Sequence, residues 1–160
     1  MRFTLIKDLK KEKAMVLLLR FLLLFIFLYT ITNIFVKSST LGLSVTNVTL
    51  TLFGSEENFI DPLGTASFLE LIHTEIFFVM MVSFILSAIF IRIATKSIIN
   101  RLLVNFLMLF ALGELISLGL AYFVSDSIII EYLICFYIWH ALLLYMTLYS
   151  VWRLFFAKSL

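Results

Sequence analysis

Glu114 and His140 are the residues whose types and positions best suit chemistry inside this chain. Both lie in long apolar stretches, Glu114 thirteen residues after Arg101 and His140 thirteen residues before Arg153. Because thirteen residues of α-helix rise about 20 Å, we expect the two side chains at one depth. A carboxylate in hydrocarbon takes up a proton or takes a partner, and a histidine at its level can share that proton. The pair therefore predicts a proton relay, a pH sensor or a cation site, or else an interhelical hydrogen bond with a structural role.

A second polar layer is expected further along the helices. Counting Asn33 from Lys13 and His73 from Arg92, the basic residues expected on the cytoplasmic side, places both about 28–30 Å from that side. Glu70 shares a helical face with His73, because the two are three residues apart. We expect this face, together with Phe77, to point into the protein, and Glu75 on the opposite face to reach the lipid headgroups. Asn33, His73 and Glu70 would then form a layer separate from Glu114 and His140.

The two histidines also raise two cofactor hypotheses. His73 and His140 would lie on diagonally opposed helices and could supply the axial ligands of one b-type haem, although the counted depths differ by about 9 Å. A metal site built from both histidines with Glu70 or Glu114 has suitable ligand types, but no close ligand spacing supports it. Haem b and a proton or metal-ion transport site therefore stand as alternatives to a noncatalytic proton-responsive pair.

The composition places these residues in a membrane protein. The chain has 160 residues, of which 63% are hydrophobic and only 14% charged, and its mean hydropathy is +1.15. Soluble domains contain about half apolar and a quarter charged residues, so this chain could not cover its apolar surface in water. The net charge of +2 is too small to indicate a nucleic-acid partner. Phosphate-loop, dinucleotide and zinc-protease motifs are absent from the sequence, so we do not expect an enzyme.

Four apolar stretches are long enough to cross a bilayer, which requires about 20 helical residues. Their mostly short connections predict an all-α membrane protein, an up-down-up-down bundle of four transmembrane helices within a single domain, 15–160. The one long connection, loop 37–65, mixes apolar and β-branched residues, which indicates a hairpin or an interfacial segment. We expect it to form a lid over the bundle, with ligand binding as the alternative. The expected spans are 15–36, 68–93, 102–123 and 128–155.

The basic residues predict the orientation in the membrane. The basic segment 1–14, the connection between the second and third spans, and the C-terminal tail hold nearly all the lysines and arginines. Such residues concentrate on the cytoplasmic side, so both termini are expected in the cytoplasm, with loop 37–65 outside a bacterial inner membrane. The expected function is that of an accessory or sensory subunit of a membrane complex, in contact with lipid and with other membrane subunits or further copies of itself.

Overall fold

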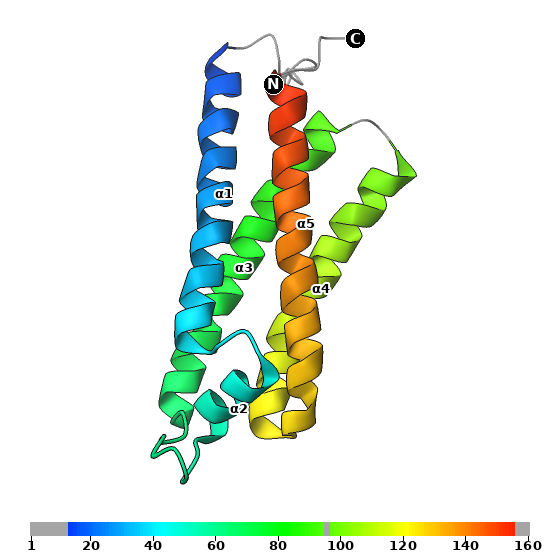
Figure 1. Ribbon diagram of the computed structural model, residues 1–160. Helices are drawn as coiled ribbons and strands as arrows, with labels where there is room; N and C mark the ends of the chain where they lie inside the picture. The colour runs from blue at the N-terminus through cyan, green and yellow to red at the C-terminus, as the bar shows by residue number, and fades with distance from the viewer. Residues whose placement is uncertain (1–12, 95–96, 156–160) are drawn as a thin grey trace, which may run out of the picture.

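A computed structural model describes residues 13–94 and 97–155 of the chain. This part contains four long helices (Figure 1): α1 (Lys13–Thr40), α3 (Thr65–Ile93), α4 (Ile98–Phe123) and α5 (Ile129–Phe155). Each has 26–29 residues, which rise about 39–44 Å, and each is apolar enough to cross a membrane. The all-α bundle of four transmembrane helices is therefore confirmed. Most of the basic segment 1–14 lies outside the described residues.

The four helices alternate in direction along the chain. The start of α1 and the end of α5 lie at the same end of the bundle, which we call the terminal end (Figure 1). The opposite end carries the connection from α1 to α3 and the tight turn from α4 to α5, where the short 3-10 helix η1 (Asp126–Ile128) precedes α5. The helix α5 packs against all three other long helices. Side chains on α5 can therefore meet groups from every span.

Loop 37–65 contains a helix rather than a β-hairpin. The helix α2 (Val45–Phe53) begins after Ser44, whose side chain accepts a hydrogen bond from the Asn47 backbone N–H. Val48 and Leu52 are four residues apart and both are buried, which is helical spacing rather than strand alternation. Figure 1 shows α2 lying across the end of the bundle opposite the terminal end, as expected for a lid. We call this end the α2 end.

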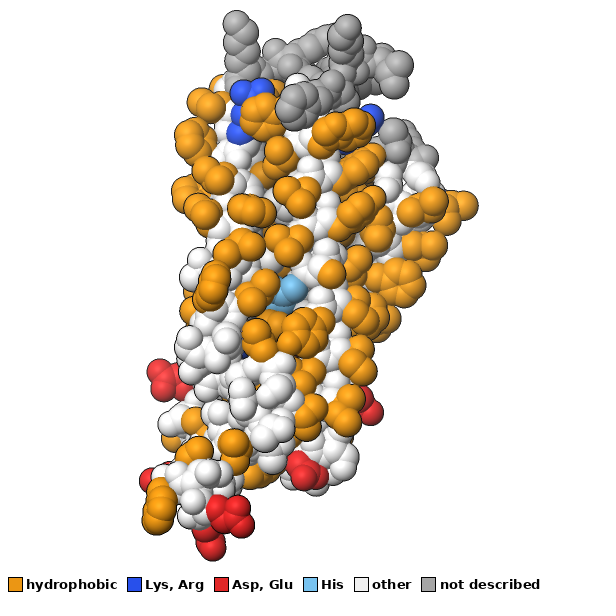
Figure 2. Space-filling model, viewed as in Figure 1, with side chains coloured by type: hydrophobic (Ala, Val, Ile, Leu, Met, Phe, Trp, Pro, Cys, Tyr) orange, Lys and Arg blue, Asp and Glu red, His pale blue; other side chains and the backbone are white. Residues whose placement is uncertain are grey.

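The buried apolar side chains form two clusters along the bundle. One lies at the α2 end and includes Leu41, Val48, Phe68 and Phe136. The larger one includes residues of all four long helices, with Trp139 of α5 fully buried. Outside these clusters, large apolar side chains are exposed along all four long helices, and on the face seen in Figure 2 they form a broad apolar belt. In this view Lys and Arg gather toward the terminal end and Asp and Glu toward the α2 end (Figure 2), the charge separation on which the orientation prediction depends.

The buried face of α3 is the opposite of the expected one. Phe77 is 60% exposed, whereas Val79, Ser83 and Leu86 are buried. Large apolar side chains gain nothing from leaving lipid for a protein interior, while small side chains allow close helix approach. The helix therefore turns Ser83 inward and leaves Phe77 on the outer surface. His73 lies about 12 Å from the first residue of α3.

Candidate functional site

A buried ion pair joins α1 to α3. Lys37 is only 1% exposed, and its Nζ lies 3.2 Å from Oε1 of Glu75, whose side chain is 14% exposed. The sequence prediction ended the first span at residue 36 and directed Glu75 toward the headgroups, and both expectations are wrong. The helix α1 continues to Thr40, because the extra turn carries Lys37 to its partner inside the bundle. An isolated ammonium or carboxylate there would bear the full cost of desolvation.

Glu114 adds a second carboxyl group to this pair. It is 1% exposed and shares the buried face of α4 with Ser117 and Ala121, as the helical spacing predicts. Lys37 and Glu75 both act on it electrostatically. The three ionisable groups come from three different helices, and in their charged forms they carry one positive and two negative charges. Lys37 can therefore neutralise only one of the two carboxylates.

Tyr132 of α5 completes the buried cluster, the name we use for Lys37, Glu75, Glu114 and Tyr132. The Lys37 Nζ lies 5.9 Å from the centroid of the Tyr132 ring, within the range of a cation–π contact, and Tyr132 is fully buried. Four buried polar atoms of this cluster have no hydrogen-bond partner among the described residues: Lys37 Nζ, Glu75 Oε2, Glu114 Oε2 and Tyr132 OH. Unsatisfied buried polar groups are uncommon in native proteins, so their concentration here marks the candidate site.

His140 lies beside the cluster and is bound to Asn33 of α1. Its Nδ1 is 2.9 Å from the Phe136 carbonyl oxygen, which can only accept, so Nδ1 carries a proton. Its Nε2 is 3.1 Å from Oδ1 of the Asn33 side-chain amide, an oxygen that accepts from Nε2 when the ring is charged. That amide also donates from Nδ2 to the Tyr29 hydroxyl, at 3.4 Å. Both ring nitrogens of His140 are therefore engaged, and Lys37 is close enough to act on the ring electrostatically.

The Asn33 contact shows that the expected two polar layers are wrong. Depth along α1 was counted from Lys13, but Arg20 is the residue level with the end of α5, because its guanidinium lies 4.2 Å from the centroid of the Phe155 ring. Counted from Arg20, Asn33 is thirteen residues or about 20 Å along the helix, the depth counted for His140. The prediction failed because depth along α1 was counted from Lys13 instead of Arg20, and not because the rise per residue was wrong.

The predicted site residues separate into a buried and an exposed group. Glu114, His140 and Asn33 are buried, although no hydrogen bond joins Glu114 to His140 within the described chain. Glu70 and His73 are exposed on the outer face of α3. The structure therefore does not place His73 and His140 around one cavity, as axial haem ligands require. The described ranges also contain no group of three His, Cys, Asp or Glu residues arranged to hold a metal ion.

Sequence reasoning missed Lys37, Glu75 and Tyr132. Two of them carried a usable signal. Lys37 follows Asn33 by four residues and Tyr132 precedes His140 by eight, spacings that place each pair on one helical face. Extending the first span by one turn would have included Lys37. For Glu75 the signal was weak, because the other polar residues on the buried face of α3, Ser83 and Ser87, are small and uncharged.

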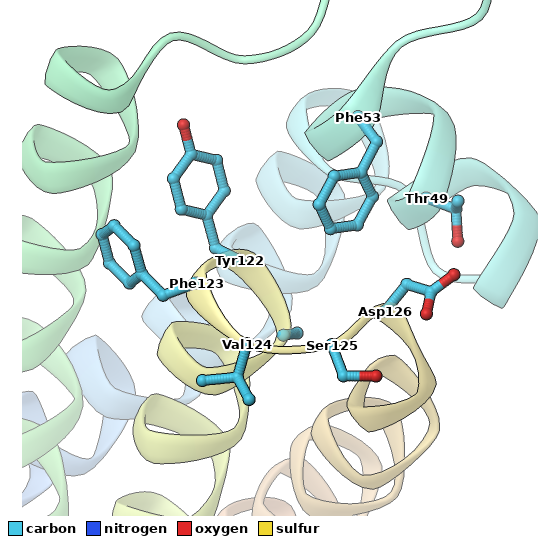
Figure 3. A pocket seen from close by; sticks show the side chains of 8 residues that line it. Thr49, Phe53, Tyr122, Phe123, Val124, Ser125 and Asp126 are labelled. Atoms are coloured by element: carbon cyan, nitrogen blue, oxygen red, sulfur yellow. The ribbon is translucent and has the colours of Figure 1, made fainter.

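A surface pocket of about 380 Å³ lies apart from the buried cluster, between α2 and the turn from α4 to α5 (Figure 3). Phe53 of α2 and Tyr122 of α4 face each other across it, with Asp126 at one side. The Tyr122 hydroxyl donates to the Leu63 carbonyl oxygen at 2.8 Å. The Tyr122 ring stacks on the Phe68 ring, with 3.9 Å between the ring centroids. None of the buried cluster lines this pocket, so it offers no direct entry to the candidate site.

Comparison with known proteins agrees with the membrane fold. No curated protein and no solved structure matches the chain. A family model described as a transmembrane helical domain matches residues 42–160, which include α2 to α5 and therefore Glu75, Glu114, Tyr132 and His140. Asn33 and Lys37 precede the matched region. Because the match covers most of the chain, this protein is an integral membrane protein that belongs to the Aq_1264_TM family of transmembrane helical domains.

Proposed function

We propose that this protein is a proton-responsive membrane protein, whose buried cluster takes up and releases one proton, and that it acts as a sensory or accessory subunit of a membrane complex. The observation that carries the proposal is that the described residues place two carboxyl groups and a single ammonium group inside an apolar bundle. With Lys37 charged, one proton on either carboxyl makes the cluster neutral. Loss of that proton leaves the cluster with one net negative charge, which is energetically unfavourable inside an apolar bundle.

No other described group that acts on Glu114 offsets this surplus negative charge. Among the described residues, the groups that interact electrostatically with Glu114 come from α1, α3 and α5, and Lys37 is the only cation among them. The other groups are acids that are neutral or negative, so they cannot offset a second carboxylate. They are Tyr29 of α1, Glu75 of α3, and Tyr132 and Cys135 of α5.

A change of charge at this point acts on all the long helices. Lys37 belongs to α1, Glu75 to α3, Glu114 to α4 and Tyr132 to α5, so repulsion between the two carboxylates presses α3 and α4 apart while Lys37 is drawn to both. Rigid-body shifts of packed helices are a common way of converting a local charge change into a signal. The exposed apolar belt offers the surface through which such a shift would reach a partner helix or a second copy of the chain.

The same proposal places the terminal end in the cytoplasm of a bacterial cell, with α2 outside the inner membrane. The described arginines Arg20, Arg92, Arg101 and Arg153 support this, because basic residues concentrate on the cytoplasmic side. A reporter domain that is active only in the cytoplasm is expected to be active when it is fused to either terminus, and a reporter that is active only outside is expected to be inactive at both. A reporter at one terminus that is active outside would contradict this orientation.

Infrared spectroscopy of the protein reconstituted in lipid vesicles tests proton uptake directly. A protonated carboxyl group gives a C=O stretching band that disappears on deprotonation, so the wild-type protein should show one such band that titrates with pH. The isosteric variant Glu114→Gln should lose it. The control variant Glu131→Gln removes an exposed carboxyl group of α5 and should leave the band unchanged. A band that survives both Glu114→Gln and Glu75→Gln, or that is absent from the wild type, would refute the proposal.

A further inference from the structure

Three buried hydroxyl groups in the terminal half of the bundle lack the usual partner of a helical hydroxyl. Ser87 of α3 and Thr147 and Ser150 of α5 are 5%, 1% and 0% exposed, and their oxygens have no hydrogen-bond partner in the described chain. Helical serines and threonines normally bond to the carbonyl four residues earlier. Six such bonds are found within residues 13–94 and 97–155, made by Thr30, Ser39, Thr40, Thr49, Thr51 and Thr74.

The three hydroxyl groups continue the line of polar groups that begins at His140. The helices α3 and α5 run in the same direction, and two contacts relate their levels. Trp139 Nε1 donates to Ser83 Oγ at 3.0 Å, and Tyr149 packs on Phe90 with 5.6 Å between ring centroids. These pairs are 56 and 59 residues apart in sequence. Ser87 is therefore level with residues 143–146 of α5, between His140 and Thr147.

The resulting order along the bundle is His140, Ser87, Thr147, Ser150 and Arg153, and we call these five residues the polar file. Successive members differ in level by one to six residues, and on average by just over three residues, or about 5 Å. That separation is too long for a direct hydrogen bond and suits one bridging water between neighbours. The file ends at Arg153, whose Nε is also buried and has no hydrogen-bond partner among the described residues. It therefore leads from the level of His140 to the terminal end of the bundle.

The opposite route from the buried cluster is closed by apolar side chains. Leu41, Val48, Leu52 and Phe68 are at most 1% exposed and pack together at the α2 end. The lid over them is held in place, since the Tyr137 hydroxyl donates to the Leu43 carbonyl oxygen at 2.8 Å. Water approaching from the α2 end meets this apolar cluster, whereas in the terminal half the larger apolar cluster also contains the hydroxyl groups of the polar file.

We propose that the polar file is a hydrated proton path, through which the buried cluster exchanges its proton with the terminal side of the membrane. This inference rests on the proposed function, because the proton bound at Glu114 is the one that travels. In each step a water or hydroxyl oxygen accepts a proton on one side and releases its own on the other, with no transfer of electrons. Beyond the His140–Asn33 contact, the last water of the path gives up one proton, which forms an O–H bond at the Glu114 carboxylate, and takes another proton from its neighbour in the path.

The rate of hydrogen–deuterium exchange at the Glu114 carboxyl tests the path. The infrared band is followed in reconstituted protein after a rapid change to D₂O. Thr147→Val removes a hydroxyl of the file at nearly constant volume and should slow the exchange about tenfold, as expected for the loss of about 1.4 kcal/mol of relay stabilisation. The pH titration of the band should not change. The matched control Thr30→Val removes a buried hydroxyl that is bonded to the Ile26 carbonyl and should not slow exchange. Equal rates in the two variants would overturn the path.

Silver ions provide a second test that does not depend on Glu114. In a Cys135→Ala background, Thr147→Cys and Ser150→Cys should react with Ag⁺ added on the terminal side of sealed vesicles, and Thr30→Cys should not. Thiols that remain are counted by mass spectrometry after alkylation in denaturant. If neither Thr147→Cys nor Ser150→Cys reacted with Ag⁺, or if they reacted only with Ag⁺ added on the α2 side, the path would be overturned. Absence of a titrating Glu114 band together with reactive file cysteines would instead refute the proposed function and support water entry.

Discussion

The side-chain amide of Asn33 lies 3.1 Å from Nε2 of His140 and so joins α1 to α5 in the middle of the bundle. Because Nδ1 of His140 donates to the Phe136 carbonyl, the state of Nε2 follows the charge of the ring. A charged ring donates from Nε2 to the Asn33 amide oxygen, and a neutral ring accepts from the amide N–H after the amide turns over. Asn33 can therefore pair with His140 in both states and keep the two helices together.

Loss of the Asn33 amide should destabilise the bundle. In Asn33→Ala the Nε2 of His140 is left buried without a partner, which costs about 1–3 kcal/mol. The free energy of unfolding in mixed micelles, followed by circular dichroism as denaturing detergent is added, measures this loss. The control Asn58→Ala changes an exposed loop residue and is expected to alter stability by no more than about 0.5 kcal/mol. If Asn33→Ala lowered the free energy of unfolding by no more than the Asn58→Ala control, the contact would not stabilise the fold.

Lys37 and Glu75 should behave as a coupled pair. Lys37→Met leaves two buried carboxyl groups with no cation and is expected to cost about 3–5 kcal/mol. Glu75→Gln should cost less, because Glu114 remains as a partner for Lys37. The double variant should cost less than the sum of the single variants by about 0.5–3 kcal/mol. Unfolding free energies of the four proteins form the test, and strict additivity would mean that the two side chains do not interact.

Gly42 should be required for the position of α2. Its φ is +84°, and a Cβ there would overlap the Asn47 side chain. Gly42→Ala is therefore expected to cost about 1–3 kcal/mol of local backbone strain and to raise amide hydrogen exchange across Val45–Phe53. At Gly64 a Cβ meets nothing within 4 Å, so Gly64→Ala is the control. Identical exchange in the two variants would show that the turn before α2 tolerates a side chain.

Gly113 should set the approach of α4 to α5, one residue before Glu114. A Cβ at Gly113 would lie 2.9 Å from Cys135 Sγ, whereas one at Gly119 would lie 3.7 Å from Ile72 Cδ1. Gly113→Ala is expected to destabilise the bundle by about 1–3 kcal/mol through overpacking, and Gly119→Ala to have little effect. Adding Cys135→Ala should restore the stability of Gly113→Ala, because the obstructing sulfur is removed. Thermal unfolding of the three proteins measures this, and a failure of rescue would place the strain elsewhere.

Hydropathy and helical spacing alone predicted the four spans, the alternating direction of the helices and the inward faces around Glu114 and His140. These follow from strictly local properties, because a span needs only enough apolar residues to cross the hydrocarbon. The same properties do not decide which apolar face of a helix meets protein and which meets lipid, since both environments suit Phe77 or Val79 equally well. The inward face of α3, and with it Glu75, was therefore predicted wrongly.

The sequence by itself determined a membrane bundle with a few ionisable groups that cannot face lipid. Only the tertiary structure decided which of them meet, because that depends on how far each helix is rotated and shifted along its axis. In the observed register of α1, Arg20 contacts Phe155, Asn33 reaches His140, and one further turn brings Lys37 to Glu75. A helix repeats its geometry every few residues, so neighbouring registers are alike in local structure, and contacts between distant segments select one of them.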